Sequence, residues 1–214
     1  MNDIIDFHTH RLDASRALIS VNPRQFDPQP GCWYSVGFHP WQGVESLTDE
    51  DYALLEQCLG HPQVLAVGET GMDNLRGGSL DVQAAAFVRH LRLAESAGKP
   101  VVVHSVRTTQ QILAIRRREG LTAVPLVIHG MRGNEHVART WIEADCYLSF
   151  GARFNPAALR VTPLDRLLIE TDDQMTAIQE VADRVSSSLM MASTDLLSLV
   201  AANATRVLNL QAPF

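Results

Sequence analysis

The sequence lacks the features that would assign it to several specialised classes of protein. Its 214 residues include only three cysteines, Cys32, Cys58 and Cys146, which are widely spaced and form no C-x-x-C motif. This pattern disfavours a disulfide-stabilised fold or a cysteine zinc cluster. We therefore expect free, buried thiols in a reducing, cytoplasmic environment.

Long apolar runs and excess positive charge are also missing. No run approaches the roughly 18 apolar residues of a membrane-spanning helix, and residues 1–3 enter the first apolar run without the basic segment of a signal peptide. We expect no membrane partner. The net charge of −6 disfavours binding of a long nucleic-acid duplex through a broad basic face. An anionic substrate held locally by metal ions remains compatible with it.

What the sequence does contain is an alternation of short apolar runs with segments of helical periodicity. The predicted strands are residues 4–7, 17–21, 34–38, 65–67, 101–103, 126–128, 147–150 and 167–169. The predicted helices are residues 49–59, 80–97, 108–119, 134–144, 177–191 and 195–208. Such alternation is typical of a parallel sheet, and this number of strands predicts an α/β fold of the (β/α)8 TIM-like barrel type, formed by residues 1–214 as a single domain.

The predicted barrel is distorted, because two outer helices are missing from it. Only nine residues, 8–16, separate the first two strand-like runs, too few for a normal crossover helix. The segment NPRQFDPQPG between the second and third runs is rich in proline and polar residues, and therefore predicts a loop. The C-terminal helix, these loops or a second subunit must cover the exposed flank, so a homo-oligomer is one of three open alternatives.

Metal-ligating residue types recur at the carboxyl ends of the apolar runs. They are His8 and His10 in IIDFHTH, Glu69 in VLAVGET, His104 in VVVH, His129 in LVIH and Asp172 in LLIETD. Parallel α/β barrels place their chemistry at these strand ends. Histidine and carboxylate side chains together suit Zn, Mn, Fe or, less readily, Mg. The set therefore predicts a binuclear metal site.

Each of these residues also has an ordinary structural explanation when it is considered alone. His8 and His10 are a pair that a surface turn would also contain, and Glu69 is a charge that would suit the start of a loop. His104 and His129 resemble hydrogen-bonded core histidines, and Asp172 resembles the N-cap of a helix beginning near Thr176. The metal interpretation is favoured because all six positions coincide with strand ends.

Several segments, in order and spacing, resemble the signature motifs of the TatD-related metal-dependent hydrolases of the amidohydrolase superfamily. They are DFHTH, GFHPW, VGETGMD, VVVHS, LLIETD and NATRVL, and the resemblance extends over residues 4–210. It implies a distorted (β/α)8 barrel that acts on ester bonds. Characterised members of the family include metal-dependent deoxyribonucleases.

The resemblance also implies roles for individual residues. His8, His10, Glu69 and Asp172 would hold one divalent ion, and Glu69, His104 and His129 the other. His39 would lie near a substrate phosphate, Asp73 would be a carboxylate behind the ligands, and Asn203 would be structural. The ions would lower the pKa of a water molecule, which Asp172 would orient and deprotonate, so that Asp172 and Glu69 are the predicted catalytic residues.

Three arginines follow strand ends closely enough to reach a substrate phosphate. Of Arg107, Arg132 and Arg153, we favour Arg132 because it lies only three residues beyond His129 in HGMRG. All three also suit solvated loops. The tryptophans Trp33, Trp41 and Trp141 suit the core or its rim, and Trp41 has the alternative of stacking on a base beside His39.

The sequence departs from the family pattern mainly in its loops. HSVR replaces the usual H-x-R after the fifth strand, and DQMTAIQEV follows ETD where the family has a longer loop. Phosphodiesters of single-stranded DNA are the favoured substrate. A small phosphoester, lactone or amide is the alternative within the hydrolases, and a non-catalytic, metal-stabilised binding module is the alternative of another class.

Overall fold

The structure, a computed structural model, describes residues 3–210. The chain divides into two compact units. Of the described residues, the first unit comprises 3–19 and 127–210, and the second comprises 20–126. Both boundaries lie inside strands, β2 (Ala17–Val21) and β6 (Leu126–Ile128). The sequence predicts no signal peptide at residues 1–3, and two of these, Met1 and Asn2, lie outside the described residues.

All strand pairs within the two units are parallel. The remaining strands are β1 (Asp6–Thr9), β3 (Trp33–Val36), β4 (Val64–Asp73), β5 (Val101–Val106), β7 (Tyr147–Phe150) and β8 (Leu167–Ile169). In the first unit β1 pairs with β2, and β7 pairs with both β6 and β8. In the second unit β4 pairs with both β3 and β5. The order of the strands in the sheet follows their order in the chain.

Helices alternate with the later strands, as the periodicity predicts. They are α1 (Asp49–Leu59), α2 (Leu80–Ala97), α3 (Thr109–Arg118), α4 (Glu135–Glu143), α5 (Pro156–Val161), α6 (Ile178–Leu189) and α7 (Ser193–Val207). Local signals fix their ends. Thr48 and Asp51 form a capping box at the start of α1, and α2 runs from the Ser79 N-cap to Gly98, whose φ of 63° suits a residue without a side chain.

The described chain has no α-helix between β1 and β2, and only a 3-10 turn, η1 (Pro23–Gln25), between β2 and β3. The predicted loss of two outer helices is therefore confirmed. The short helix α5 was not predicted, because its six residues are too few to show a periodicity. Its signal is local: Asn155 caps the helix and Pro156 occupies its first turn.

Four predicted strand ends are wrong. The first run ends at Thr9 rather than residue 7, and the fifth ends at Val106 rather than residue 103. The third run ends at Val36 rather than residue 38, and the fourth continues through Asp73 rather than stopping at residue 67. Glu69 and Asp73 therefore lie inside β4 and not in the loop behind it. Polar residues are accommodated there because their backbone pairs with β5, from Thr70 opposite Val103 to Asp73 opposite Val106. Their side chains find partners within the site described below.

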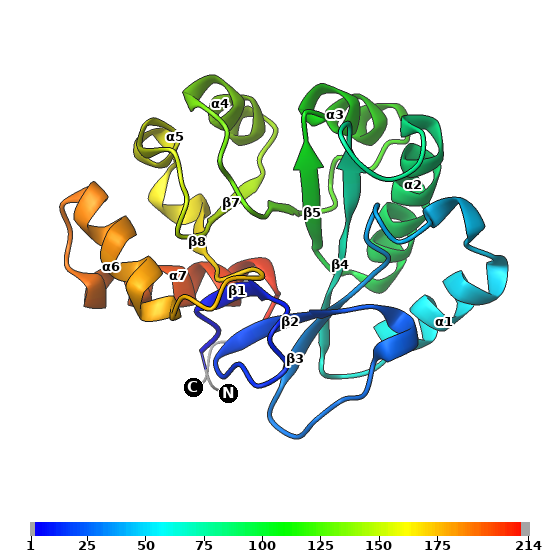
Figure 1. The fold of residues 1–214 in the computed structure, drawn as a ribbon, viewed down its shortest axis with the longest axis horizontal. Helices are drawn as coiled ribbons and strands as arrows, with labels where there is room; N and C mark the ends of the chain where they lie inside the picture. Colours follow the sequence, from blue (N-terminus) through cyan, green and yellow to red (C-terminus); the bar gives the residue numbers. More distant parts are fainter. Residues whose placement is uncertain (1–2, 211–214) are drawn as a thin grey trace. The chain divides into compact units, whose positions relative to one another are not determined.

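Each unit has its own apolar core. In the second unit, α2 packs along β4 (Figure 1) and buries Phe87 and Leu91 completely. In the first unit, α7 packs on β8, and Trp141 of α4 and Phe150 of β7 are buried. Cys58 and Cys146 are buried, whereas Cys32 is half-buried. Among residues 3–210 no single helix is long and apolar enough to cross a membrane, although α6 and α7, bent by 105° at their junction, together pass that test.

A buried neutral histidine joins α2 to the end of β3. The backbone N–H of Phe38 donates to Nε2 of His90 (3.0 Å), and the Nδ1 atom of His90 lies 2.8 Å from the carbonyl oxygen of Ala86. Burial lowers the pKa of His90 to about 4, and the charge of Arg89 adds to the effect. A protonated Nε2 cannot accept the Phe38 hydrogen bond, so the fold requires the neutral ring.

We expect this histidine to make stability pH-dependent in acid. The unfolded chain takes up the proton near pH 6.5 and the folded chain near pH 4, so stabilisation present above pH 6.5 is lost between these values, on the order of 3 kcal/mol. Urea unfolding at pH 7, 5.5 and 4.5 should show a shallower pH dependence in His90→Gln than in the native protein. His136→Gln, at an exposed position, is the control. Equal pH dependence in all three proteins would contradict the assignment.

Candidate metal centre

In the first unit, one carboxylate faces two histidines. Oδ1 of Asp172 lies 3.7 Å from Nε2 of His8 and 3.8 Å from Nε2 of His10. His8 is fully buried inside β1, whereas His10 lies just beyond the strand and is 44% exposed in its side chain. The three residues form a group whose potential ligand atoms lie within 4.8 Å of one another. Such a spacing is compatible with one ion coordinated by all three.

The backbone holds Asp172 in this position. Its N–H donates to the carbonyl oxygen of His8 (2.9 Å), and its own carbonyl oxygen accepts from the N–H of His10 (3.2 Å). Asp172 has a φ of 58°, in the left-handed region that aspartate and asparagine tolerate better than most residues. The helix α6 has Ala177 as its N-cap, so Asp172 does not cap it. Strain of this kind is typical of functional positions.

Glu170, which was not among the predicted site residues, lies beside His129. Its Oε1 accepts the N–H of Gly130 (2.6 Å) and lies 3.5 Å from Nδ1 of His129. Glu170 is fully buried, and among residues 3–210 its Oε2 has no hydrogen-bond partner. A buried carboxylate oxygen in this state fits a nearby cation. The signal that identifies it is the carboxylate two residues before Asp172 in LLIETD.

A second buried carboxylate supports the end of β8. Asp6 accepts hydrogen bonds from both the backbone N–H (2.9 Å) and the hydroxyl (2.7 Å) of Thr171. Burial raises the pKa of Asp6 to about 7 although these hydrogen bonds act in the opposite direction. The hydroxyl oxygens of Thr171 and Thr9 lie 2.9 Å apart. These contacts tie the β1 and β8 ends together next to His8 and Asp172.

The second unit presents a carboxylate between two further histidines. Oε1 of Glu69 lies 2.8 Å from Nδ1 of His104 and 3.0 Å from Nε2 of His39. Glu69 is 4% exposed, so its charge is removed from bulk water. His39, Glu69 and His104 form another group of closely spaced ligand atoms. The sequence assigned His39 to substrate phosphate alone, and the structure adds its contact with Glu69.

Glycine is required immediately before Glu69. Gly68 has a φ of 132°, and a Cβ atom there would lie 2.5 Å from the carbonyl oxygen of Val102 in β5. A Cβ atom on Gly37 would in turn lie 2.7 Å from the Cα of Gly68. The N–H of Glu69 donates to the hydroxyl of Ser20 (3.2 Å). Close backbone packing thus fixes the start of the Glu69 side chain.

Asp73 supports His104 from the opposite side of the ring. Its Oδ2 lies 3.2 Å from Nε2 of His104 and accepts the indole N–H of Trp41 (2.8 Å). Burial would raise the pKa of Asp73, but hydrogen bonds from Leu75, Trp41 and His104 outweigh that effect and lower it. A carboxylate behind a histidine ring fixes the orientation of the ring.

The predicted arginines lie at exposed positions, and Asn203 makes hydrogen bonds to the backbone. Arg132 is half-exposed, and its Nη2 lies 3.9 Å from Oδ2 of Asp172. Arg107 and Arg153 are exposed. Asn203 donates to the carbonyl oxygens of Leu164 (2.7 Å) and Leu167 (2.8 Å), and so supports the start of β8 from α7.

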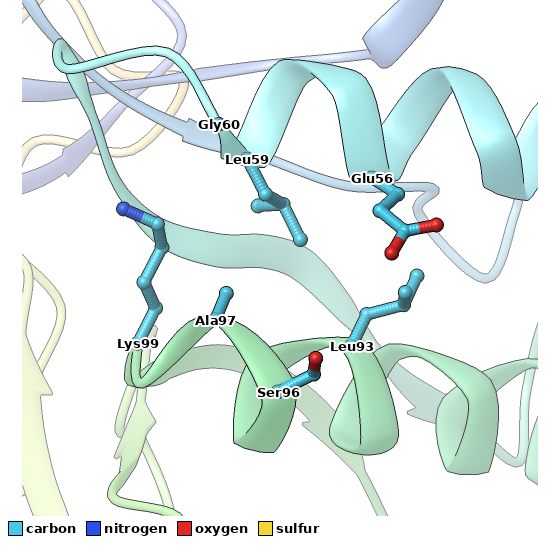
Figure 2. A pocket seen from close by; sticks show the side chains of 7 residues that line it. All are labelled: Glu56, Leu59, Gly60, Leu93, Ser96, Ala97 and Lys99. Atoms are coloured by element: carbon cyan, nitrogen blue, oxygen red, sulfur yellow. The ribbon is translucent and has the colours of Figure 1, made fainter.

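A pocket in the second unit lies away from Glu69 and Asp73 of the same unit. It has a volume of about 340 Å³ between α1 and α2, and Glu56, Leu59 and Lys99 are among the residues that line it (Figure 2). Nζ of Lys99 donates to the carbonyl oxygen of Val64, the first residue of β4, whereas Glu69 and Asp73 lie in the carboxyl half of that strand. The pocket therefore belongs to the opposite end of β4 from the histidines.

The donor set fits divalent metal ions. Each unit brings histidine nitrogens and carboxylate oxygens within 4.8 Å of one another, and the buried Oε2 of Glu170 adds an oxygen that needs a partner. Mixed nitrogen and oxygen ligands of this kind suit Zn or Mn better than Ca. Parallel strands that alternate with helices and carry such groups at their carboxyl ends define the class of metal-dependent hydrolase barrels.

Comparison with known proteins identifies the family within this class. The family model TatD related DNase matches residues 21–209. The uncharacterized metal-dependent hydrolase YabD of Bacillus subtilis is 28% identical in an alignment that covers 81% of this chain and 76% of YabD. The 3'-5' ssDNA/RNA exonuclease TatD of Cronobacter sakazakii is 34% identical over 73% of this chain and 63% of its own length. The chain belongs to the TatD-related DNase family.

Solved structures agree on the fold. The crystal structure of YjjV, a TatD homologue from Escherichia coli, has a TM-score of 0.81 at 20% identity and covers 98% of this chain and 99% of its own. A TatD family hydrolase from Entamoeba histolytica has a TM-score of 0.77 at 14% identity, with 96% and 98% covered. The predicted (β/α)8 barrel and the predicted metal-dependent hydrolase are thus both confirmed.

Proposed function

We propose that this protein hydrolyses phosphodiester bonds in single-stranded nucleic acid and uses two divalent ions to do so. The observation that carries the proposal is that each unit presents a carboxylate facing two histidines, Asp172 in the first and Glu69 in the second. The relative named 3'-5' ssDNA/RNA exonuclease supports the choice of substrate. The three widely spaced cysteines, which form no C-x-x-C motif, support a reducing, cytoplasmic setting.

The proposed ligands are those predicted from the sequence. They are His8, His10, Glu69, His104, His129 and Asp172, with Zn, Mn or Mg as the candidate ions. All six belong to closely spaced groups within one unit or the other, and His129 shares its group with Glu170 and Asp172. Glu170 is therefore an additional candidate, either as a ligand or as the carboxylate that orients His129.

The chain's own residues would carry out the proton transfer and hold the substrate. When bound, the ions supply Lewis acidity that lowers the pKa of the attacking water and offsets charge on the phosphoryl oxygens. Asp172 accepts the proton of the water as its oxygen bonds to phosphorus, and the ester P–O bond on the opposite side breaks. The leaving oxygen takes a proton from solvent. Arg132, next to Asp172, and His39, next to Glu69, then steady the phosphate.

A second candidate substrate is a small phosphoester. Only residues 173–176 separate Asp172 from the Ala177 N-cap of α6, so the segment that follows the proposed base offers little surface for a long strand. The phosphotriesterase homology protein of Escherichia coli, solved with phosphate in its active site, shares the fold with a TM-score of 0.63 at 12% identity. An amide or lactone has no comparable observation in its favour.

Cleavage of labelled nucleic acid tests the proposal. We expect the Mn²⁺-loaded protein to shorten a 5'-labelled single-stranded oligonucleotide, to act at least tenfold more slowly on the same strand in a duplex, and to lose activity on chelation. Bis(p-nitrophenyl) phosphate, assayed in parallel, represents the small-substrate alternative. Turnover of the small ester with no cleavage of the strand would show that single-stranded nucleic acid is not the substrate. The assignment as a hydrolase would still hold.

A further inference from the structure

An exposed tryptophan lies against the histidines of the second unit. The indole of Trp41 is edge-on to the rings of His39 and His104, at centroid distances of 4.7 Å and 5.2 Å. Trp41 is nevertheless 45% exposed, unlike Trp141, which is 1% exposed. An exposed aromatic surface beside candidate metal ligands offers a ring on which a substrate base can stack.

The orientation of this indole is fixed from both of its ends. The indole N–H donates to Oδ2 of Asp73 (2.8 Å), the same oxygen that faces His104. The backbone N–H of Trp41 donates to Nδ1 of His39 (3.1 Å). A side chain held in this way presents its ring without a further loss of rotamer freedom when a ligand binds.

A cation and a second apolar side chain complete the surface. The guanidinium of Arg76 lies 4.8 Å from the centroid of the Trp41 ring, and Leu75 is 59% exposed. Their backbone N–H groups donate to Oδ1 of Asp73, at 3.2 Å from Arg76 and 2.7 Å from Leu75. Asp73 therefore positions Trp41 through one oxygen and the Arg76 loop through the other.

We propose that Trp41 and Arg76 form a nucleotide subsite, in which the indole stacks on the base next to the bond to be cleaved and Arg76 binds the adjoining phosphate. This inference rests on the proposed function and specifies which part of the substrate the second unit recognises. Stacking on an aromatic ring is independent of base identity, because every base has a π-face. The subsite thus favours strands whose bases are unpaired and accessible.

Kinetics on natural and abasic strands test the subsite. The two substrates are identical except that tetrahydrofuran abasic sites replace the two nucleotides at the 3' end. We expect Trp41→Ala to raise KM for the natural strand about tenfold, as is typical for loss of one stacked base, and to change kinetics on the abasic strand less than twofold. Trp41→Phe keeps a ring and should stay near the native KM, and Trp33→Phe is the aromatic control.

The opposite pattern would overturn the subsite. An equal loss of kcat on both strands in Trp41→Ala would assign Trp41 a purely structural role in holding His39 and Asp73. Arg76→Gln should weaken the binding of both strands alike. It should also reduce the slope of log binding constant against log salt concentration by about one, as expected for the loss of one phosphate contact.

Binding without turnover separates this inference from the proposed function. In an Asp172→Asn, Trp33→Phe background, Trp41 is the only exposed tryptophan of the described residues. The natural strand should quench its fluorescence saturably, and the abasic strand should not. If the natural strand quenches this variant and the native protein cleaves no strand, the nucleotide subsite is supported and the proposed phosphodiesterase activity is wrong. Equal quenching by both strands, or none, would reject the subsite.

Discussion

Asp172→Asn should reduce the rate of strand cleavage by at least about 100-fold, the usual contribution of a positioned general base. Asparagine suits the left-handed backbone of Asp172, whose φ is 58°, and keeps both backbone hydrogen bonds to the β1 end. The variant therefore loses the charge and the basic oxygen that face His8 and His10 while the fold is retained. Initial rates and thermal melting on the same preparations measure both effects.

Asp173→Asn is the matched control. Asp173 is the next residue in the chain and is exposed, so the same chemical change there should leave the rate within about twofold. Native rates in Asp172→Asn would show that this carboxylate is not the base. A large loss in both variants would instead indicate a disturbed loop between β8 and α6.

Glu69→Gln should have the second largest effect. Removing this charge leaves His39 and His104, at 3.0 Å and 2.8 Å, facing a neutral amide. Outer partners of metal ligands contribute about 10- to 100-fold to metal affinity, and a direct ligand should contribute at least as much. We expect metal affinity and cleavage to fall together by about 100-fold or more, as measured by titration of the metal-free protein with Mn²⁺ and by assays at saturating metal.

Excess metal distinguishes the two roles assigned to Glu69. If Glu69 is a ligand alone, a high Mn²⁺ concentration should restore part of the rate, whereas a catalytic role predicts a low rate at any concentration. Glu56→Gln, at an exposed position on α1, is the control and should bind metal normally. Unchanged affinity in Glu69→Gln would remove Glu69 from the ligand set.

The fold was predictable where the sequence carries its information locally. Helix α2 has both of its ends as predicted, because Ser79 caps its first turn and Gly98 follows directly after its last residue. Strands β2, β6, β7 and β8 are also as predicted, because each is an uninterrupted apolar run. The extension of β4 was missed, because Glu69 and Asp73 resemble loop residues until their pairing with β5 is known.

The site was predictable in part for the same reason. Histidine and carboxylate residues at the ends of apolar runs can be recognised in a single sequence. They led to the prediction of His8, Glu69 and Asp172 as metal ligands. Glu170, directly beyond β8, was not among the predicted ligands, because only the folded chain brings Gly130 and His129 beside it. Likewise, Trp41 is oriented by Asp73, 32 residues away in the chain, and no local pattern predicts that contact.

The number of divalent ions bound per chain tests the central claim most directly. The metal-free protein, reconstituted with Mn²⁺ or Zn²⁺ and freed of excess ions, should contain two ions per chain by inductively coupled plasma mass spectrometry. Asp172→Asn and Glu69→Gln should each contain fewer at the same free metal concentration. A reconstituted native protein that retains no metal at micromolar free ion would contradict the proposed binuclear site.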